Sequence, residues 1–260
     1  MNYTVLTLFP EIINAYFATS IMSKAMQKGI IGYRAINIRD YAFDKHKTCD
    51  DAPYGGGPGM LMLAEPLSLA LEAAGIIPKE FTQRRKGAKC EAKRVIYLSP
   101  SGKPFTQALA QELAAEQELI LVCGRYEGID QRVIDRYIDD EISVGDYVLS
   151  SGEVAALAFI DATYRLVDRV ITPESLEEES FSNGLLEYPQ YTRPEIFDTM
   201  KVPEVLLSGH HENIRRWRLE QRVEKTLLNR PDLIRRCREL GLFNQEIIDL
   251  LEIVEDREHE

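Results

Sequence analysis

The first 165 residues alternate short apolar runs, rich in β-branched side chains, with stretches of helical periodicity. The apolar runs predict five strands, which begin at Tyr3, Tyr33, Arg94, Glu118 and Asp146. The helical stretches predict helices that begin at Pro10, Glu65, Pro104 and Asp130. Gly29 and Gly75 are typical of the position just after the end of a helix. Strands interleaved with helices indicate an α/β layer with a mostly parallel sheet.

The pattern changes near Asp168. Residues 168–187 hold a proline, an acidic run and little periodicity, and two more prolines follow by residue 194, which predicts an exposed, flexible linker. Only helical patterns follow, over Glu212–Leu228, Asp232–Leu240 and Asn244–Val254. The sequence therefore predicts an α/β domain over residues 1–167, a linker over 168–187 and a small all-helical C-terminal domain over 188–260.

The formal net charge of −11 argues, taken alone, against a nucleic-acid partner, because phosphate contacts favour Lys and Arg. The charge is unevenly spread, however. Ser208–Arg238 holds nine Lys and Arg against four Asp and Glu, and Arg84–Arg94 holds six against one. Residues 168–187 hold one basic residue against six acidic ones. Two basic patches therefore remain candidates for binding RNA.

A glycine-rich loop, YGGGPGM at residues 54–60, raises the question of what its backbone approaches. It lacks the Lys of a phosphate-binding Walker loop and the last Gly of a dinucleotide fingerprint. Three more loops of this character, at residues 97–102, 123–130 and 143–153, lie at or beside predicted strands. In open α/β sheets ligands bind beyond the carboxyl ends of strands, and glycines there let a backbone come close. The spacing predicts a cofactor pocket made mostly of backbone, without identifying the cofactor.

Six motifs give the chain a resemblance to a known family. In chain order they are DDAPYGGGPGM, VIYLSPSG, LILVCGRYEGID, SVGDYVLSSGE, YTRPEIF and LLSGHHENIRRWR. Together, from Asp50 to Arg218, they resemble the bacterial tRNA (guanine-N1)-methyltransferases of the TrmD type, which are SPOUT methyltransferases. The resemblance implies a parallel sheet with a C-terminal trefoil knot. Periodicity could not suggest a knot, because knots are almost absent from protein folds.

The resemblance also implies S-adenosylmethionine as the methyl donor, held in a bent form by three loops. The first loop supplies Tyr97, Leu98, Ser99, Pro100 and Gly102. The second supplies Gly124, Arg125, Tyr126, Glu127 and Gly128. The third supplies Val144, Gly145, Tyr147, Val148, Leu149 and Gly152. Leu98, Val148 and Leu149 would suit core packing as well as cofactor binding.

By the same resemblance the target is N1 of guanine 37, next to the anticodon of tRNA. This N1 carries a proton, so a general base must remove it, and charge then develops towards O6. Arg165 matches the family's arginine at O6, the alternative being a solvated helix arginine. Glu179 stands where the family has an aspartate as general base, and Glu178 is a neighbour one step away. The guanine must also leave the anticodon loop to enter a pocket.

The resemblance implies a homodimer whose active sites are composite, with Asp51 and Tyr54 of the glycine loop near the target nucleotide. Four cations on one face of a predicted helix would hold the tRNA: Arg215, Arg218, Arg222 and Lys225. The alternative for that face is a solvated set of ion pairs with Glu220 and Glu224. Mg²⁺ is implied as well, placed by Glu127 and the linker carboxylates.

Two other functions remain open. One is a SPOUT enzyme that modifies a different nucleotide or atom. The other is a catalytically idle RNA-binding relative, suggested by Glu179 and by Ser151, which stands where the family usually has Gly. The four cysteines are widely scattered, and the N-terminus does not resemble a signal peptide. We therefore expect a reduced, cytoplasmic protein without a membrane segment.

Overall fold

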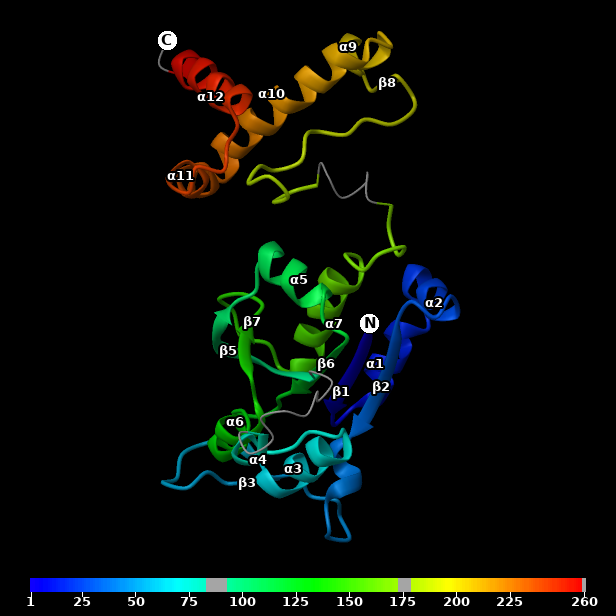
Figure 1. Ribbon diagram of the computed structural model, residues 1–260, viewed down its shortest axis with the longest axis vertical. Helices are drawn as coiled ribbons and strands as arrows, with labels where there is room; N and C mark the ends of the chain where they lie inside the picture. The colour runs from blue at the N-terminus through cyan, green and yellow to red at the C-terminus, as the bar shows by residue number, and fades with distance from the viewer. Residues whose placement is uncertain (83–92, 173–178, 259–260) are drawn as a thin grey trace. The chain divides into compact units, whose positions relative to one another are not determined.

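The computed structural model describes residues 1–82, 93–172 and 179–258. It divides the chain into two compact units, Met1–Ile171 and Thr172–Glu260 (Figure 1). Each unit is described by itself.

The first unit contains a five-stranded sheet. Its strands are β1 (Asn2–Thr7), β2 (Gly32–Asn37), β5 (Lys93–Pro104), β6 (Glu118–Cys123) and β7 (Asp140–Ser143). Neighbours pair in the order β2-β1-β6-β5-β7, and every pair is parallel. A short antiparallel pair, β3 (Asp50–Asp51) and β4 (Leu61–Met62), flanks the glycine loop. The predicted α/β fold with a parallel sheet is confirmed.

The fifth predicted strand, beginning at Asp146, is wrong. The strand is β7, which ends at Ser143, and the chain then turns. The N–H of Tyr147 donates to the carbonyl of Gly145 at 2.9 Å, so residues 145–147 form a tight turn. Tyr147 and Val148 are exposed rather than buried in a sheet.

The helices of the first unit connect the strands. They are α1 (Pro10–Phe17), α2 (Ser20–Gln27), α3 (Ala64–Ala73), α4 (Lys79–Thr82), α5 (Gln107–Ala114), α6 (Gln131–Tyr137) and α7 (Gly152–Tyr164), with a 3-10 turn η1 (Ile38–Tyr41). The helix expected at Pro104 begins later, because Pro104 ends β5 and the hydroxyl of Thr106 caps α5 by accepting from the N–H of Leu109 at 3.3 Å. Asp130 caps α6 in the same way, accepting from the N–H of Arg132 at 2.9 Å.

The sheet is buried on both faces, as its continuous apolar runs require. Along β6, Leu119 and Leu121 face a core shared with α1, α2, α5 and α7, whereas Ile120 and Val122 face a core shared with α3 and α6. Figure 1 shows these two sets of helices on opposite sides of the strands. The carboxyl ends of the strands are left for loops.

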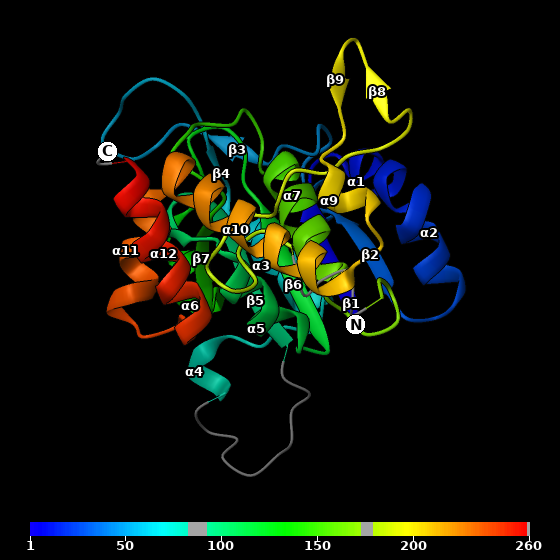
Figure 2. The ribbon, with the colours of Figure 1, turned by 90° about the horizontal axis from the view of Figure 1, so that it is seen from above.

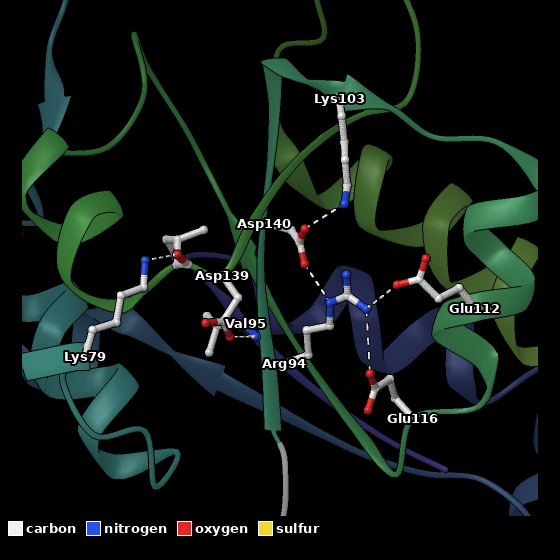
Figure 3. A network of polar contacts seen from close by, with 9 residues as sticks. Lys79, Arg94, Val95, Lys103, Glu112, Glu116, Asp139 and Asp140 are labelled. Carbon is white, nitrogen blue, oxygen red and sulfur yellow. Dashed lines mark hydrogen bonds and ion pairs between the residues drawn. The ribbon is translucent and has the colours of Figure 1, made fainter. Parts of the chain in front are cut away.

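Strand β5 leaves its ladder for four residues. Leu98 and Lys103 both pair with Ile142 of β7, so residues 99–102 form an excursion between them. A polar network holds β5 on both sides of the excursion (Figure 3). Asp140 accepts from Arg94 Nε at 2.6 Å and from Lys103 Nζ at 2.7 Å, and Arg94 also contacts Glu112 at 2.7 Å. The excursion is therefore anchored at its base by charge-assisted hydrogen bonds.

The second unit is not all-helical, contrary to the prediction. A two-stranded hairpin, β8 (Ile196–Phe197) and β9 (Met200–Lys201), precedes its helices (Figure 2). The chain reverses through two residues of positive φ, Asp198 and Thr199, which carry no helical or apolar pattern. The helices are α9 (Glu204–Leu207), α10 (His211–Asn229), α11 (Pro231–Glu239) and α12 (Gln245–Glu258).

Helix α10 is the centre of the second unit, with α11 and α12 packed against it. The segment that leads into this unit also contacts α10. Leu185 is fully buried in the core, and the N–H of Leu186 donates to the hydroxyl of Thr226 at 2.8 Å. The end of the segment expected to be an exposed linker is thus packed onto a helix.

Candidate active site

A cavity of about 290 Å³ lies at the carboxyl ends of β5, β6 and β7. Its wall comes from three loops, within residues 97–101, 124–128 and 142–155. This is the place where parallel α/β sheets bind ligands. Backbone groups and small side chains make up much of the wall, so the cavity suits a ligand read by main-chain N–H and C=O groups.

Fifteen of the sixteen residues predicted to bind the cofactor line this one cavity, and the exception is Gly102. Gly102 instead lies against β7, where an added Cβ would come within 2.3 Å of the backbone nitrogen of Ile142. Its glycine is needed for two strands to approach closely. Gly102 is therefore structural to the cavity rather than part of its wall.

Six further residues line the cavity that sequence reasoning did not assign to it: Ser101, Ile142, Ser143, Ser150, Ser151 and Ala155. Ser143 shapes the third loop, because its hydroxyl donates to the carbonyl of Gly145 at 3.1 Å. Ser151 has an extended backbone, with φ −158°, so a serine adopts this conformation without strain. Small polar residues in loops carry no periodic signal, and only their position beside the glycines could have indicated them.

The glycine loop packs against the second cofactor loop of its own chain. Gly59 has a φ of +89°, and an added Cβ would lie 2.4 Å from Glu127 Oε1. The N–H of Glu127 donates to the carbonyl of Met60, and that of Met62 to the carbonyl of Gly128, both at 3.0 Å. These contacts place the end of the glycine loop at the mouth of the cavity.

The other end of the glycine loop is open to solvent. Tyr54 is fully exposed, and Asp51 is exposed as well. The hydroxyl of Tyr126, from the second cofactor loop, donates to Asp50 at 3.1 Å. Asp51 and Tyr54 are thus held beside the cavity's second loop while their side chains remain available to another molecule.

Burial controls the ionisation of two phenols that line the cavity and of a thiol, Cys123, that precedes its second loop. It raises the pKa of the Tyr97 phenol, and partial burial with the hydrogen bond to Asp50 raises the pKa of Tyr126. Complete burial, with the nearby charge of Glu153, raises the pKa of the Cys123 thiol well above its usual value. These groups stay neutral near pH 7, so the two phenols act as hydrogen-bonding groups and Cys123 is no nucleophile.

Neither of the two side chains expected to act in catalysis, Arg165 and Glu179, lines this cavity. Arg165 follows the last residue of α7, whereas the first residue of α7, Gly152, lines the cavity. A helix of 13 residues spans about 20 Å. Glu179 belongs to the second unit, where its carbonyl accepts from the N–H of Ser182 at 3.2 Å. Glu178 and residues 83–92, which include most of the basic segment, fall outside the described residues.

The four α10 cations differ in their surroundings. Arg215 pairs with Glu212 and Glu246, each at 2.8 Å, and the guanidinium of Arg218 stacks over the ring of Tyr188 at 4.7 Å. Lys225 is exposed and donates to the carbonyl of Glu187 at 3.0 Å.

The predicted solvent-facing position of Arg222 is wrong. Its side chain is 6% exposed, and its Nε donates to the carbonyl of Leu186 at 3.3 Å. The segment around Leu186 covers this part of α10, so the guanidinium is turned into the unit.

Residues 1–82, 93–172 and 179–258 contain no group of three or more His, Cys, Asp or Glu side chains that could hold a metal ion. Within the same ranges, no helix combines the length and apolar character that crossing a bilayer demands.

Comparison with known proteins agrees with the motifs. Residues 1–236 match the family model described as tRNA (Guanine-1)-methyltransferase TrmD. A protein of Treponema denticola, named tRNA (guanine-N(1)-)-methyltransferase, is 60% identical over 256 residues, which are 98% of this chain and 100% of that protein. Proteins of the same name are 57% identical in Treponema pallidum, over 96% of this chain and 95% of theirs, and in Borreliella burgdorferi, over 90% and 92%. The chain therefore belongs to the tRNA (guanine-1)-methyltransferase TrmD family.

Proposed function

We propose that this protein transfers the methyl group of S-adenosylmethionine to N1 of guanine 37 in tRNA. The observation that carries the proposal is the single cavity beyond β5, β6 and β7. Fifteen residues assigned to the cofactor from family motifs, in three separate stretches of the chain, meet in it. The relatives in Treponema and Borreliella that carry the name of this activity are more than half identical over nearly the whole chain.

The cavity fits S-adenosylmethionine in its chemistry. Backbone groups of residues 97–101 and 142–152 can read the edge of an adenine ring, and the exposed rings and aliphatic chains of Tyr147, Val148 and Leu149 offer apolar contact. We propose that these loops form the trefoil knot of the SPOUT fold. The pairing of Ile142 with both Leu98 and Lys103, on either side of the 99–102 excursion, supports an arrangement in which the chain passes closely around β7.

In the proposed mechanism, bound S-adenosylmethionine supplies the methyl group and leaves as S-adenosylhomocysteine. The carboxylate of Glu179 removes the N1 proton of guanine as N1 forms its bond to the methyl carbon. The guanidinium of Arg165 donates to O6, where negative charge develops, and lowers the energy of the transition state.

The length of α7 supports a homodimer with composite sites. Arg165 stands about 20 Å from the cavity end of its own helix, farther than an arginine side chain reaches. A second copy of the chain would bring its own Arg165 to this cavity. The exposed Asp51 and Tyr54 then meet the partner and the target nucleotide.

We assign three parts to this reaction. Residues 1–167 bind the cofactor, residues 168–187 carry the base, and residues 188–260 bind tRNA through Arg215, Arg218 and Lys225. A tRNA substrate implies a cytoplasmic enzyme. Residues 173–178, which include Glu174, Glu177 and Glu178, lie outside the described residues, so the Mg²⁺ site expected around Glu127 and the linker carboxylates stays a prediction.

The test is methyl transfer to two matched substrates. The protein is incubated with labelled S-adenosylmethionine, Mg²⁺ and a tRNA bearing G37, beside the same tRNA bearing A37. Label in the G37 tRNA alone is the expected result. Label in both tRNAs would indicate a different target nucleotide. Binding of tRNA without label in either would indicate a catalytically idle relative.

A further inference from the structure

Helix α7 begins with a buried carboxylate that has no assigned function. Glu153 is the second residue of this helix and has 0% exposure, although it does not line the cavity. Its Oε1 accepts from the hydroxyl of Thr7 at 2.6 Å, and Thr7 in turn accepts from the N–H of Phe9 at 2.9 Å. The carboxylate is therefore anchored to the carboxyl end of β1. A carboxylate out of water costs free energy unless a cation compensates it.

The compensating cation is Arg125, in the second cofactor loop. Glu153 Oε2 lies 3.9 Å from Arg125 Nε, and among the described residues neither atom has a hydrogen-bond partner. The attraction between the two is therefore electrostatic. The guanidinium also stacks over the ring of Phe9, at 4.5 Å from its centroid. The charge of Glu153 and the ring of Phe9 therefore both hold the guanidinium of Arg125 in place.

Arg125 also binds the third cofactor loop. Its Nη1 donates to the carbonyl of Ser150 at 2.9 Å, and both residues line the cavity. One guanidinium therefore joins the β6–α6 loop to the β7–α7 loop. A shift of about 1 Å would bring Nε into hydrogen-bond distance of Glu153, so the guanidinium can adjust without leaving the carboxylate.

We propose that Glu153 is a positioning residue for the cofactor. Its charge fixes Arg125, which holds the Ser150 carbonyl and the third loop in the form that the cofactor requires. The inference rests on the proposed function, because it takes S-adenosylmethionine as the ligand of the cavity. A neutral side chain at position 153 could still accept from Thr7, but it would no longer attract the guanidinium.

The first experiment measures the affinity of purified variants for S-adenosylhomocysteine by calorimetry. Glu153→Gln is expected to weaken binding about tenfold, because a buried charge pair is lost. Thr163→Val is the matched control. Thr163 is fully buried on the same helix and shares a 2.8 Å hydrogen bond with the hydroxyl of Tyr3, but it does not line the cavity. Its loss should lower the unfolding temperature and leave the affinity unchanged.

A double-mutant cycle separates positioning from a general effect on packing. If Glu153 acts through Arg125, Glu153→Gln has no further effect on affinity in an Arg125→Met background. Wild-type affinity in Glu153→Gln, or the same tenfold loss in both backgrounds, would overturn the proposal. If Glu153→Gln does not fold, Glu153→Met, which removes the charge at a similar side-chain volume, takes its place, and the same two outcomes decide. A wild-type protein that does not bind S-adenosylhomocysteine would instead refute the proposed function.

Discussion

The backbone N–H of Gly152 donates to the carbonyl of Gly124 across 2.8 Å. This bond joins the second and third cofactor loops at the point where α7 begins. A Cβ on Gly152 would lie 2.6 Å from the backbone nitrogen of Gly124 and 2.8 Å from Cα of Cys123. Neither atom is the movable end of a side chain, so the two loops can meet only through glycine.

Gly152→Ala should therefore disrupt the cavity. We expect the free energy of unfolding to fall by about 1–3 kcal/mol, because the added methyl group overpacks a backbone contact. Binding of S-adenosylhomocysteine should weaken more than tenfold. Val154→Ala is the control, since Val154 is 51% exposed on the same helix and does not line the cavity. Calorimetry and urea unfolding of both variants check this. Equal behaviour of the two would show that the loops tolerate separation.

The parts of the fold that could be predicted are those whose signal is local. Strands β1 and β6 lie inside the sheet, so both faces are buried and each reads as an apolar run. Strand β7 is at the edge and carries Asp140 and Glu141, so it has little apolar signal. The exposed Tyr147 and Val148, four residues later, resemble a strand better than β7 does.

In the candidate site, too, only the features with a local signal could be predicted from the sequence. The glycines indicated the cofactor loops in the sequence, because a backbone that another group approaches closely needs glycine at that position. This requirement is local and does not depend on distant segments. The burial of Arg222 and Glu153, in contrast, depends on segments distant in sequence, Leu186 in one case and Thr7 in the other. Helical spacing gives the face of a residue on its own helix. It does not give what covers that face.

The polar network at the base of the β5 excursion should make the free energy of unfolding depend on pH under acidic conditions. Partial burial raises the pKa of Asp140, but the hydrogen bonds from Arg94 and Lys103 outweigh it and hold the pKa below its usual value. The Asp140 carboxylate therefore stabilises the fold above its unfolded pKa of about 3.9, and this contribution is lost as pH falls through the lower folded value.

Arg94→Met tests this pair. At pH 7 we expect the free energy of unfolding to fall by about 2 kcal/mol, because the substitution leaves the Asp140 carboxylate, which is 14% exposed, with one partner fewer. The difference from wild type should shrink below pH 4. Arg132→Met removes an ion pair whose arginine is 75% exposed, so its effect should stay below about 0.5 kcal/mol. Denaturant unfolding between pH 7 and pH 3 measures both. A difference that does not depend on pH would assign the effect to packing instead.

On α10, two cations one turn apart should behave differently. Arg222→Met should lower the free energy of unfolding by about 1–3 kcal/mol, because the carbonyl of Leu186 loses its buried donor. Lys225→Met should leave stability nearly unchanged, since Lys225 is exposed. It should reduce the salt dependence of tRNA binding by roughly one phosphate contact. Filter binding at several salt concentrations checks the second expectation. If a well-folded Arg222→Met variant shows a weaker salt dependence of tRNA binding, Arg222 contacts the RNA after all.

The assignment of the general base leads to a separable prediction. Glu179→Gln keeps the size of the side chain and removes its ability to take a proton. We expect methyl transfer to guanine 37 to fall by about 10²–10⁴-fold, the usual contribution of a general base. Binding of S-adenosylhomocysteine should stay at the wild-type level, because Glu179 does not line the cofactor cavity of its own chain.

Two further glutamates complete this experiment. Glu204→Gln, at an exposed position in the first turn of α9, is the matched control and should retain full turnover. Glu178→Gln tests the neighbour that the motif alignment leaves open. A large loss in Glu178→Gln with turnover retained in Glu179→Gln would move the base by one residue and keep the mechanism. Near wild-type turnover in both would mean that neither carboxylate removes the N1 proton, and the base would have to come from elsewhere in the composite site.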